Sequence, residues 1–194
     1  MYLRLSPDEE SIKDIFLSFF DAECSIERVR NAEGSGFDAT AWERFIETGG
    51  PGMCLPESCG GGGADLTTAA IVANLLGTYV APIPFIEHVV AARLLASLDE
   101  SNANLPLLAT GEMIGSLALQ SLHGSASAIV PAGAIANYII GLRGEEIVVA
   151  ENTTGAFPLR NTANLPIARN NFDDAIVIAS GEEAHNAYQR AKSE

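Results

Sequence analysis

The sequence predicts an α+β protein, in which an N-terminal antiparallel helical bundle is followed by a small antiparallel β-sheet or barrel domain and then by the start of a further helix. Residues 1–112 repeat apolar side chains at helical spacing between caps and Gly or Pro breaks. Residues 113–181 carry short β-rich runs separated by turns, and residues 182–194 return to helix-forming composition. These three ranges are the domains that we expect.

Three helices are predicted before residue 50. A capping box with proline at the first helical position begins the first helix at residues 6–9, and apolar residues then recur at Ile12, Ile15, Phe16 and Phe19. A second helix is predicted around residues 26–30. A third follows Asp38 as its N-cap, ends at Gly49-Gly50, and is expected to bury Trp42, Phe45 and Ile46.

Two more helices follow a glycine-rich turn. Residues 55–63 are not expected to form regular structure, and Asp65 then caps a helix. Small residues dominate one side of that helix, which predicts close approach of another backbone in the middle of a bundle: Leu66, Ala69, Ala70, Ala73, Leu76 and Gly77. The prolines of residues 81–84 end it, and residues 85–98 form the next helix.

Short β-rich runs at residues 115–119, 137–142 and 146–150 predict strands. The second and third are joined by Arg143-Gly144-Glu145, which indicates a hairpin. Further runs at residues 157–160 and 175–179 complete the predicted sheet or barrel.

The composition of the chain disfavours several classes of partner and location. The formal net charge of −14 disfavours nucleic acid as a partner, although local cations could still bind an anionic coenzyme. The three cysteines are an odd set, and the N-terminus lacks the pattern of a secretory signal, so we expect a cytoplasmic protein. Prolines and charges interrupt the longest apolar stretch, so no membrane span is predicted.

Three patterns in the sequence are candidate sites. The glycines at 60–63 lack the Lys-Ser/Thr pair of a Walker loop and the preceding strand of a dinucleotide loop, so a tight turn is favoured over a phosphate site. The dispersed histidines and cysteines match no triad or metal set, and no carboxylate is marked as a general base. The Ser/Gly loop at 120–127 is either an ordinary turn or a loop that binds a polar ligand.

The segment at residues 52–66, with Pro56-Glu57 before Gly60–Gly63 and a helix, resembles a turn of the acyl-CoA dehydrogenases. The Pro-rich break at 81–85, the helix at 91–96, the link at 107–112 and the strand at 171–175 resemble the same family in the same order. The resemblance implies a protein that binds FAD and removes an α proton and a β hydride from an acyl-CoA substrate. It also implies a catalytic base in a C-terminal helical domain beyond Glu194 or on another chain, so no catalytic residue is assigned here.

The resemblance places the flavin-contacting pair of the middle domain at Leu119 and Gln120, and the family's Gly-Ser at Gly124 and Ser125. Gln120 stands where the family has Thr, and its amide can still hydrogen-bond a flavin. The loop is one residue shorter, and the family's Trp-containing strand is missing before Val130; the only Trp is Trp42.

Shortened chains of this kind resemble partner subunits of heteromeric acyl-CoA dehydrogenases, including those acting on steroid-CoA thioesters. The expected assembly is therefore a homo- or hetero-oligomer with an acyl-CoA dehydrogenase subunit. Two alternatives stay open, namely a non-catalytic binding or assembly subunit and an unrelated helical domain with a β appendage.

Overall fold

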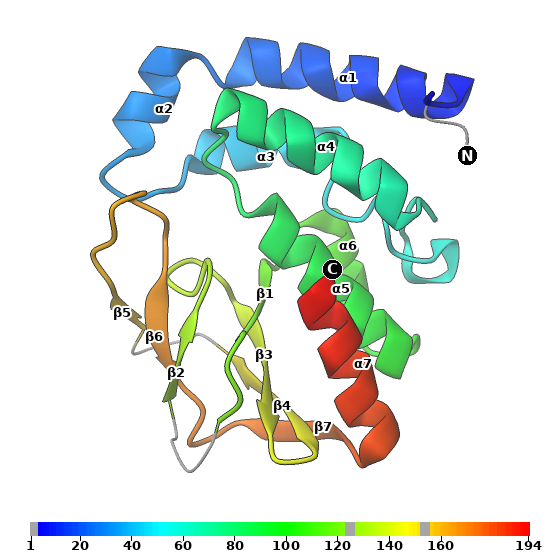
Figure 1. The fold of residues 1–194 in the computed structure, drawn as a ribbon, viewed down its shortest axis with the longest axis vertical. Helices are drawn as coiled ribbons and strands as arrows, with labels where there is room; N and C mark the ends of the chain where they lie inside the picture. The colour runs from blue at the N-terminus through cyan, green and yellow to red at the C-terminus, as the bar shows by residue number, and fades with distance from the viewer. Residues whose placement is uncertain (1–3, 123–126, 152–155) are drawn as a thin grey trace.

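The computed structural model describes residues 4–122, 127–151 and 156–194, and it confirms the α+β class (Figure 1). The helices are α1 (Pro7–Glu23), α2 (Ile26–Ala32), α3 (Ala39–Glu47), the 3₁₀ helix η1 (Glu57–Cys59), α4 (Leu66–Tyr79), α5 (Phe85–Leu98), α6 (Leu105–Thr110) and α7 (Glu182–Ser193). The strands are β1 (Gly115–Leu117), β2 (Ser127–Val130), β3 (Tyr138–Arg143), β4 (Glu146–Glu151), β5 (Phe157–Pro158), β6 (Ala168–Asn171) and β7 (Ile176–Ser180).

The predicted caps begin their helices. The side chains of Ser6, Asp38 and Asp65 each accept a hydrogen bond from the backbone N–H three residues later, at 3.2, 3.0 and 2.9 Å. Ser6 and Glu9 form the reciprocal pair of a capping box. Each bond satisfies a backbone donor at the helix start that has no partner within the helix, so the starts of α1, α3 and α4 could be predicted from the sequence.

Two local expectations are corrected. Ile15 is 58% exposed, and the buried residues of α1 are Phe16 and Phe20, because the helix packs on α3 and α4 through the i, i+4 row that contains these two rings. Residues 55–63 were expected to lack regular structure, yet one turn of 3₁₀ helix, η1, forms there.

The helical core is built around the ring of Phe45 on α3. Five other aromatic rings have centroids within 5.4 to 6.3 Å of it, and they come from α1, α3 and α5: Phe16, Phe19, Phe20, Trp42 and Phe85. Phe45 and Trp42 are buried as predicted, whereas Ile46 is only partly buried. The indole N–H of Trp42 donates to the Gly111 carbonyl at 3.0 Å, so its polar atom is satisfied inside this core.

The strands form two open sheets rather than one sheet or a barrel among the described residues. One has the order β1-β3-β4-β7 and the other β2-β6-β5. The predicted hairpin of β3 and β4 is confirmed, and Gly144 takes a φ of +65° in its turn. The expectation of a purely antiparallel sheet is wrong at one edge, where β1 pairs parallel to β3 because the chain crosses over through β2 before it returns.

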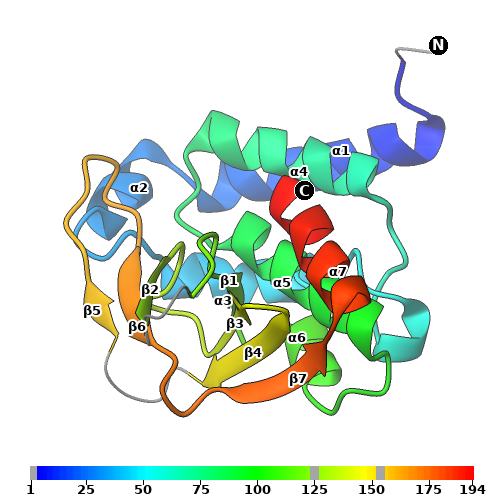
Figure 2. The same cartoon turned by 60° about the horizontal axis from the view of Figure 1, so that its bottom comes forward.

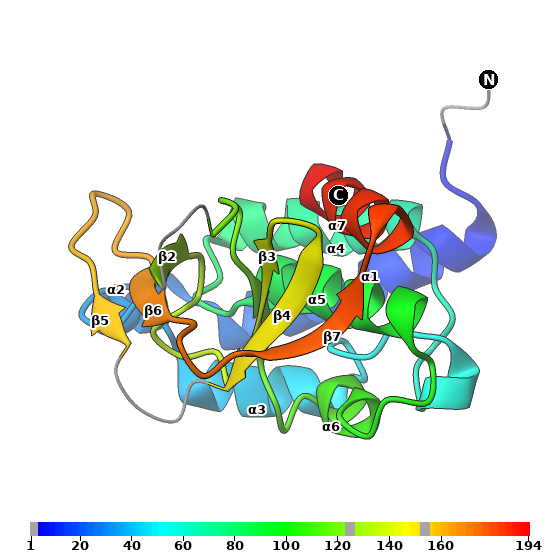
Figure 3. The same ribbon diagram turned by 90° about the horizontal axis from the view of Figure 1, so that it is seen from below.

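Helix α7 returns to the helical part of the molecule and lies beside α5 (Figures 1 and 2). The strand β7 leads directly into it at the edge of its sheet (Figure 3). At the end of α7, Glu194 accepts two hydrogen bonds from the Arg93 guanidinium of α5, at 3.0 and 3.2 Å. No helix in the described part of the chain is long and apolar enough to cross a membrane.

The Arg93–Glu194 pair gives a first prediction. Changing Arg93 to Met keeps the apolar stem but removes both hydrogen bonds, and we expect the free energy of unfolding to fall by about 1 kcal/mol. Urea denaturation followed by circular dichroism measures this change. Arg44→Met is the matched control, because the Arg44–Glu47 pair is exposed and lies within one helix; equal losses in both variants would contradict the prediction.

Candidate functional site

The two predicted flavin contacts that the structure describes, Leu119 and Gln120, lie just after β1 in an exposed segment. Leu119 is 46% exposed. On one side Ala118 N–H donates to the Ile140 carbonyl at 2.8 Å, and on the other Leu122 N–H donates to the Leu142 carbonyl at 2.7 Å. The segment between these two anchors faces outward. Gly124 and Ser125, the other two predicted contacts, lie outside the described residues.

No hydrogen bond among the described residues uses the backbone groups of Leu119 and Gln120 or the Gln120 amide. An exposed stretch that holds backbone N–H groups and a primary amide between fixed ends can present donors and acceptors to a planar ligand edge. The residues present are therefore compatible with binding the polar edge of a flavin.

Tyr188 of α7 fixes the end of β1. Its hydroxyl donates to the Ala118 carbonyl, one residue before Leu119. Burial raises the pKa of Tyr188 above its ordinary value, so the hydroxyl remains a neutral donor. This tyrosine therefore links helix α7 to the exposed segment.

A buried histidine fixes the other end of β1. His88 on α5 accepts a hydrogen bond from Gly115 N–H at Nδ1 (3.1 Å), and its Nε2, 3.0 Å from the Leu108 carbonyl, is the nitrogen that donates. Burial lowers the pKa of His88 to about 4, against the opposing effect of its bond to Leu108. A neutral ring thus connects α5, α6 and the first residue of β1, and it has the role of a structural residue.

An apolar groove of about 850 Å³ lies between α4, α5 and α7. Its apolar walls come from α4 and α5: Leu66, Ala69, Ala70, Ala73, Phe85, Ile86, Val89 and Val90. Its polar groups are Asn74 of α4 and the end of α7, with Arg190, Ser193 and Glu194. The shape and lining suit an apolar ligand with few polar atoms.

The groove accounts for part of the small-residue face of α4. That face was expected to pack against another backbone, but Ala70 and Gly77 are exposed and Ala73 is only partly buried. Leu66, Ala69, Ala70 and Ala73 line the groove instead, whereas Leu76 and Gly77 do not. Helical periodicity identifies such a stripe but cannot tell a helix contact from a cavity wall, since small residues serve both.

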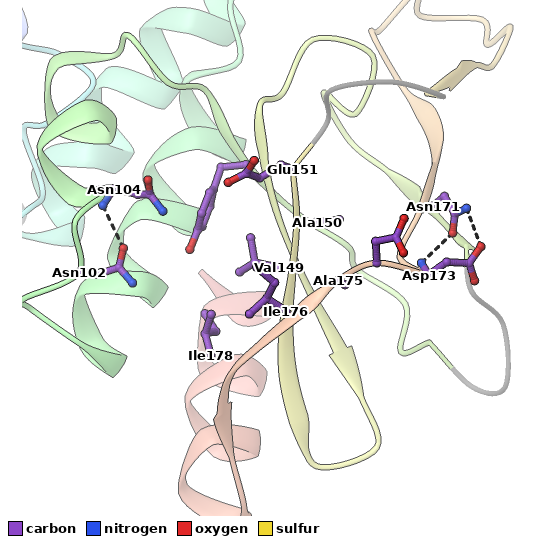
Figure 4. A pocket seen from close by; sticks show the side chains of 12 residues that line it. Asn102, Asn104, Val149, Ala150, Glu151, Asn171, Asp173, Ala175, Ile176 and Ile178 are labelled. Atoms are coloured by element: carbon purple, nitrogen blue, oxygen red, sulfur yellow. Dashed lines mark hydrogen bonds between the residues drawn. The ribbon is translucent and has the colours of Figure 1, made fainter.

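A second, polar pocket of about 500 Å³ lies between the α5–α6 connection and strands β4 and β7 (Figure 4). Asn104 N–H donates to the Asn102 side chain at 3.0 Å, and Asn171 Nδ2 donates to Asp173 at 2.7 Å. Apolar side chains of β4 and β7 form its floor. Neither Leu119 nor Gln120 lines it, so this pocket is separate from the predicted flavin contacts.

The Gly60–Gly63 turn is closed by its own backbone. The N–H groups of Gly61, Gly62 and Gly63 donate to the carbonyls of Pro56, Gly52 and Leu55 at 3.0, 3.1 and 2.9 Å. A phosphate site needs such N–H groups free to point at the ligand. The interpretation of a tight turn therefore agrees with the geometry. Three potential metal ligands do not cluster anywhere within the described residues.

The described residues thus combine an N-terminal helical bundle, two small sheets, an exposed segment after β1 and an apolar groove. The sequence profile of the acyl-CoA dehydrogenase N-terminal domain matches residues 6–112. The chain therefore belongs to the acyl-CoA dehydrogenase family.

Two curated relatives are both acyl-CoA dehydrogenase IpdE2. The protein from Mycolicibacterium smegmatis is 30% identical over 116 residues, which cover 58% of this chain and 37% of the relative. The protein from Mycobacterium tuberculosis is 35% identical over 94 residues, covering 47% and 30%. The matched stretches thus span about a third of the length of these relatives.

Solved structures share the fold over nearly the whole chain. A chain of the ChsE4–ChsE5 complex from Mycobacterium tuberculosis superposes with a TM-score of 0.85 at 18% identity, covering 99% of this chain and 64% of that one. A variant of the steroid ACAD Tcur3481–Tcur3483 gives 0.83 at 19% identity, covering 95% and 60%. An acyl-CoA dehydrogenase complexed with FAD from Bacillus anthracis gives 0.79 at 20% identity, covering 96% and 40%.

Proposed function

We propose that this chain takes part in the FAD-dependent α,β-dehydrogenation of an acyl-CoA thioester and that the catalytic base lies outside it. The observation that carries this proposal is the family membership combined with an apolar groove of about 850 Å³. In this proposal the groove holds the apolar part of the acyl group, and Leu119 and Gln120 contact the flavin. Bound FAD would supply the acceptor for the substrate hydride.

The base is assigned to another segment or chain because the groove offers no free carboxylate. Glu194 is the one carboxylate among the described residues that line it, and both of its oxygens accept hydrogen bonds from Arg93. Both oxygens of Glu194 are therefore already occupied by the Arg93 guanidinium. The residues described here therefore bind and orient, and proton removal is left to a group elsewhere.

The visible spectrum tests the proposal. The protein would be purified alone and together with an adjacently encoded homologous subunit, and its flavin absorbance recorded before and after addition of acyl-CoA. Bleaching of a bound flavin by acyl-CoA is the expected result. A colourless protein in both preparations would refute flavin chemistry for this chain.

Gln120 gives the second prediction, which concerns flavin affinity. Replacing Gln120 with Ala removes one amide that can hydrogen-bond the flavin edge, so we expect FAD to bind about tenfold more weakly. Quenching of flavin fluorescence on titration into the flavin-free protein measures the affinity. Gln189→Ala is the matched control, since Gln189 is exposed on α7 and does not line the groove. The same loss in both variants would argue against a contact at Gln120.

The short connection before β2 favours a second function. This strand begins at Ser127, which leaves no room before it for the Trp-containing strand that packs on the flavin in the family, and Trp42 is committed to the helical core. In this second proposal the chain is a non-catalytic partner or assembly subunit of a heteromeric acyl-CoA dehydrogenase. Two of the similar structures, the ChsE4–ChsE5 complex and the steroid ACAD Tcur3481–Tcur3483, each carry two named components, which supports it. Co-purification with a larger homologous subunit that alone carries flavin would distinguish it.

A further inference from the structure

The apolar groove between α4, α5 and α7 has an asymmetric distribution of charge. Its α4 and α5 walls carry no charged side chain among the described lining residues, whereas α7 contributes both charged groups, Arg190 and Glu194. A ligand that fills the groove therefore meets hydrocarbon along two walls and charge along the third. Such a site suits an amphiphile rather than a plain hydrocarbon.

The net charge of that third wall is positive. Glu194 is neutralised by Arg93, whose Nε and Nη2 donate to its two carboxylate oxygens at 3.0 and 3.2 Å. The guanidinium of Arg190 has no ion pair or hydrogen bond within the described residues, and its residue is exposed. Arg190 is therefore the unpaired cation among the described residues that line the groove.

We propose that the groove binds an acyl group that carries an anionic substituent, and that Arg190 is the specificity-determining residue that binds this anion. The inference rests on the proposed function in one respect, namely that the groove is the acyl site. The guanidinium presents paired N–H donors that match a carboxylate, and the neighbouring apolar walls keep part of the water away from the pair. A carboxylate is therefore preferred over a neutral ester of the same length.

Decanoate and methyl decanoate are the probes, because they share an apolar chain and differ in charge. Each would be titrated into the full chain by isothermal titration calorimetry at low ionic strength. We expect decanoate to bind about tenfold more tightly than the ester. Raising the salt concentration should weaken the binding of decanoate and leave the binding of the ester unchanged, since salt screens only the charged pair.

Three variants separate the contributions. Arg190→Gln should remove the preference for decanoate while ester binding is kept. Lys192→Gln is the matched control, because Lys192 lies two residues further along α7 but does not line the groove, and it should keep the preference. Ala73→Leu fills the groove from α4 and should weaken the binding of both ligands. Circular dichroism confirms that each variant is folded.

Equal binding of the two probes to the wild-type chain would overturn the proposal, as would absence of decanoate binding or a preference retained by Arg190→Gln. These readouts need neither flavin nor turnover. Arg190-dependent binding without flavin bleaching by acyl-CoA would support the groove inference and refute dehydrogenation. Flavin bleaching by acyl-CoA together with decanoate binding that does not depend on Arg190 would support dehydrogenation and refute the groove inference.

Discussion

Replacing His88 with Leu is expected to lower the free energy of unfolding by about 3 kcal/mol at neutral pH. The ring is fully buried and connects three elements, through Gly115 N–H of β1 and the Leu108 carbonyl of α6. Leucine fills a similar volume but leaves the Gly115 N–H buried without a partner, whereas the Leu108 carbonyl keeps its hydrogen bond from Gly111 N–H. A buried donor without a partner costs about 1 to 3 kcal/mol, and the edge-to-face contact of the ring with Trp42 is lost as well.

The same histidine predicts a pH dependence. Its pKa in the folded protein is about 4, below the ordinary value of 6.5, so between these values the unfolded chain binds more protons than the folded one. The stabilisation from neutral His88 is therefore complete above pH 6.5 and is lost as the pH falls toward 4. Across this window the lost stability is about 3 kcal/mol, at 1.36 kcal/mol per pKa unit.

Urea unfolding of the wild type and His88→Leu at pH 7 and pH 4.5 measures both effects. The carboxylates titrate in both proteins, so their contribution cancels in the difference between the two curves. We expect the gap between wild type and variant to be large at pH 7 and to narrow at pH 4.5. A gap that stays constant with pH would contradict a neutral, buried His88.

The helical half of the fold could be predicted because its signals are local. Caps such as Ser6 and Asp65, and breaks such as Gly49-Gly50, act within one turn of the chain, so the sequence carries them directly. The positions that the sequence predicts less well are those whose burial depends on tertiary packing. Ile15 fits the helical period as well as Phe20 does, and only the location of the Phe45 ring decides which of them is buried.

The β half was predicted less completely because its signals are non-local. Strand β6 consists of Ala168–Asn171, whose residue types have low strand preference, and it forms because β2 and β5 pair on its two sides. The parallel pairing of β1 with β3 depends on how the chain crosses over. The groove has the same origin, since α7 reaches α4 and α5 only in the folded chain. Leu119 and Gln120, by contrast, came from resemblance, and their contact with a flavin stays a prediction.

Replacing Gly61 with Ala is expected to lower the free energy of unfolding by about 3 kcal/mol, although the change adds one methyl group. A Cβ at this position would lie 2.2 Å from the Leu55 carbonyl oxygen and 2.5 Å from its carbonyl carbon. That backbone cannot move freely, because the Leu55 side chain is buried and its carbonyl accepts the Gly63 N–H. Relief of the clash would therefore have to break the closed turn that leads into α4.

Gly77→Ala is the matched control for this prediction, because the same methyl group there has no neighbour within 4 Å and the residue lies within α4. Alanine restricts the unfolded chain and favours helix, so we expect a gain of about 0.5 kcal/mol. Urea unfolding of the two variants should thus give changes of opposite sign. If Gly61→Ala were as stable as the wild type, the turn would not require glycine at this position. Opposite signs would instead show that Gly61 is required for the close approach of its backbone to that of Leu55.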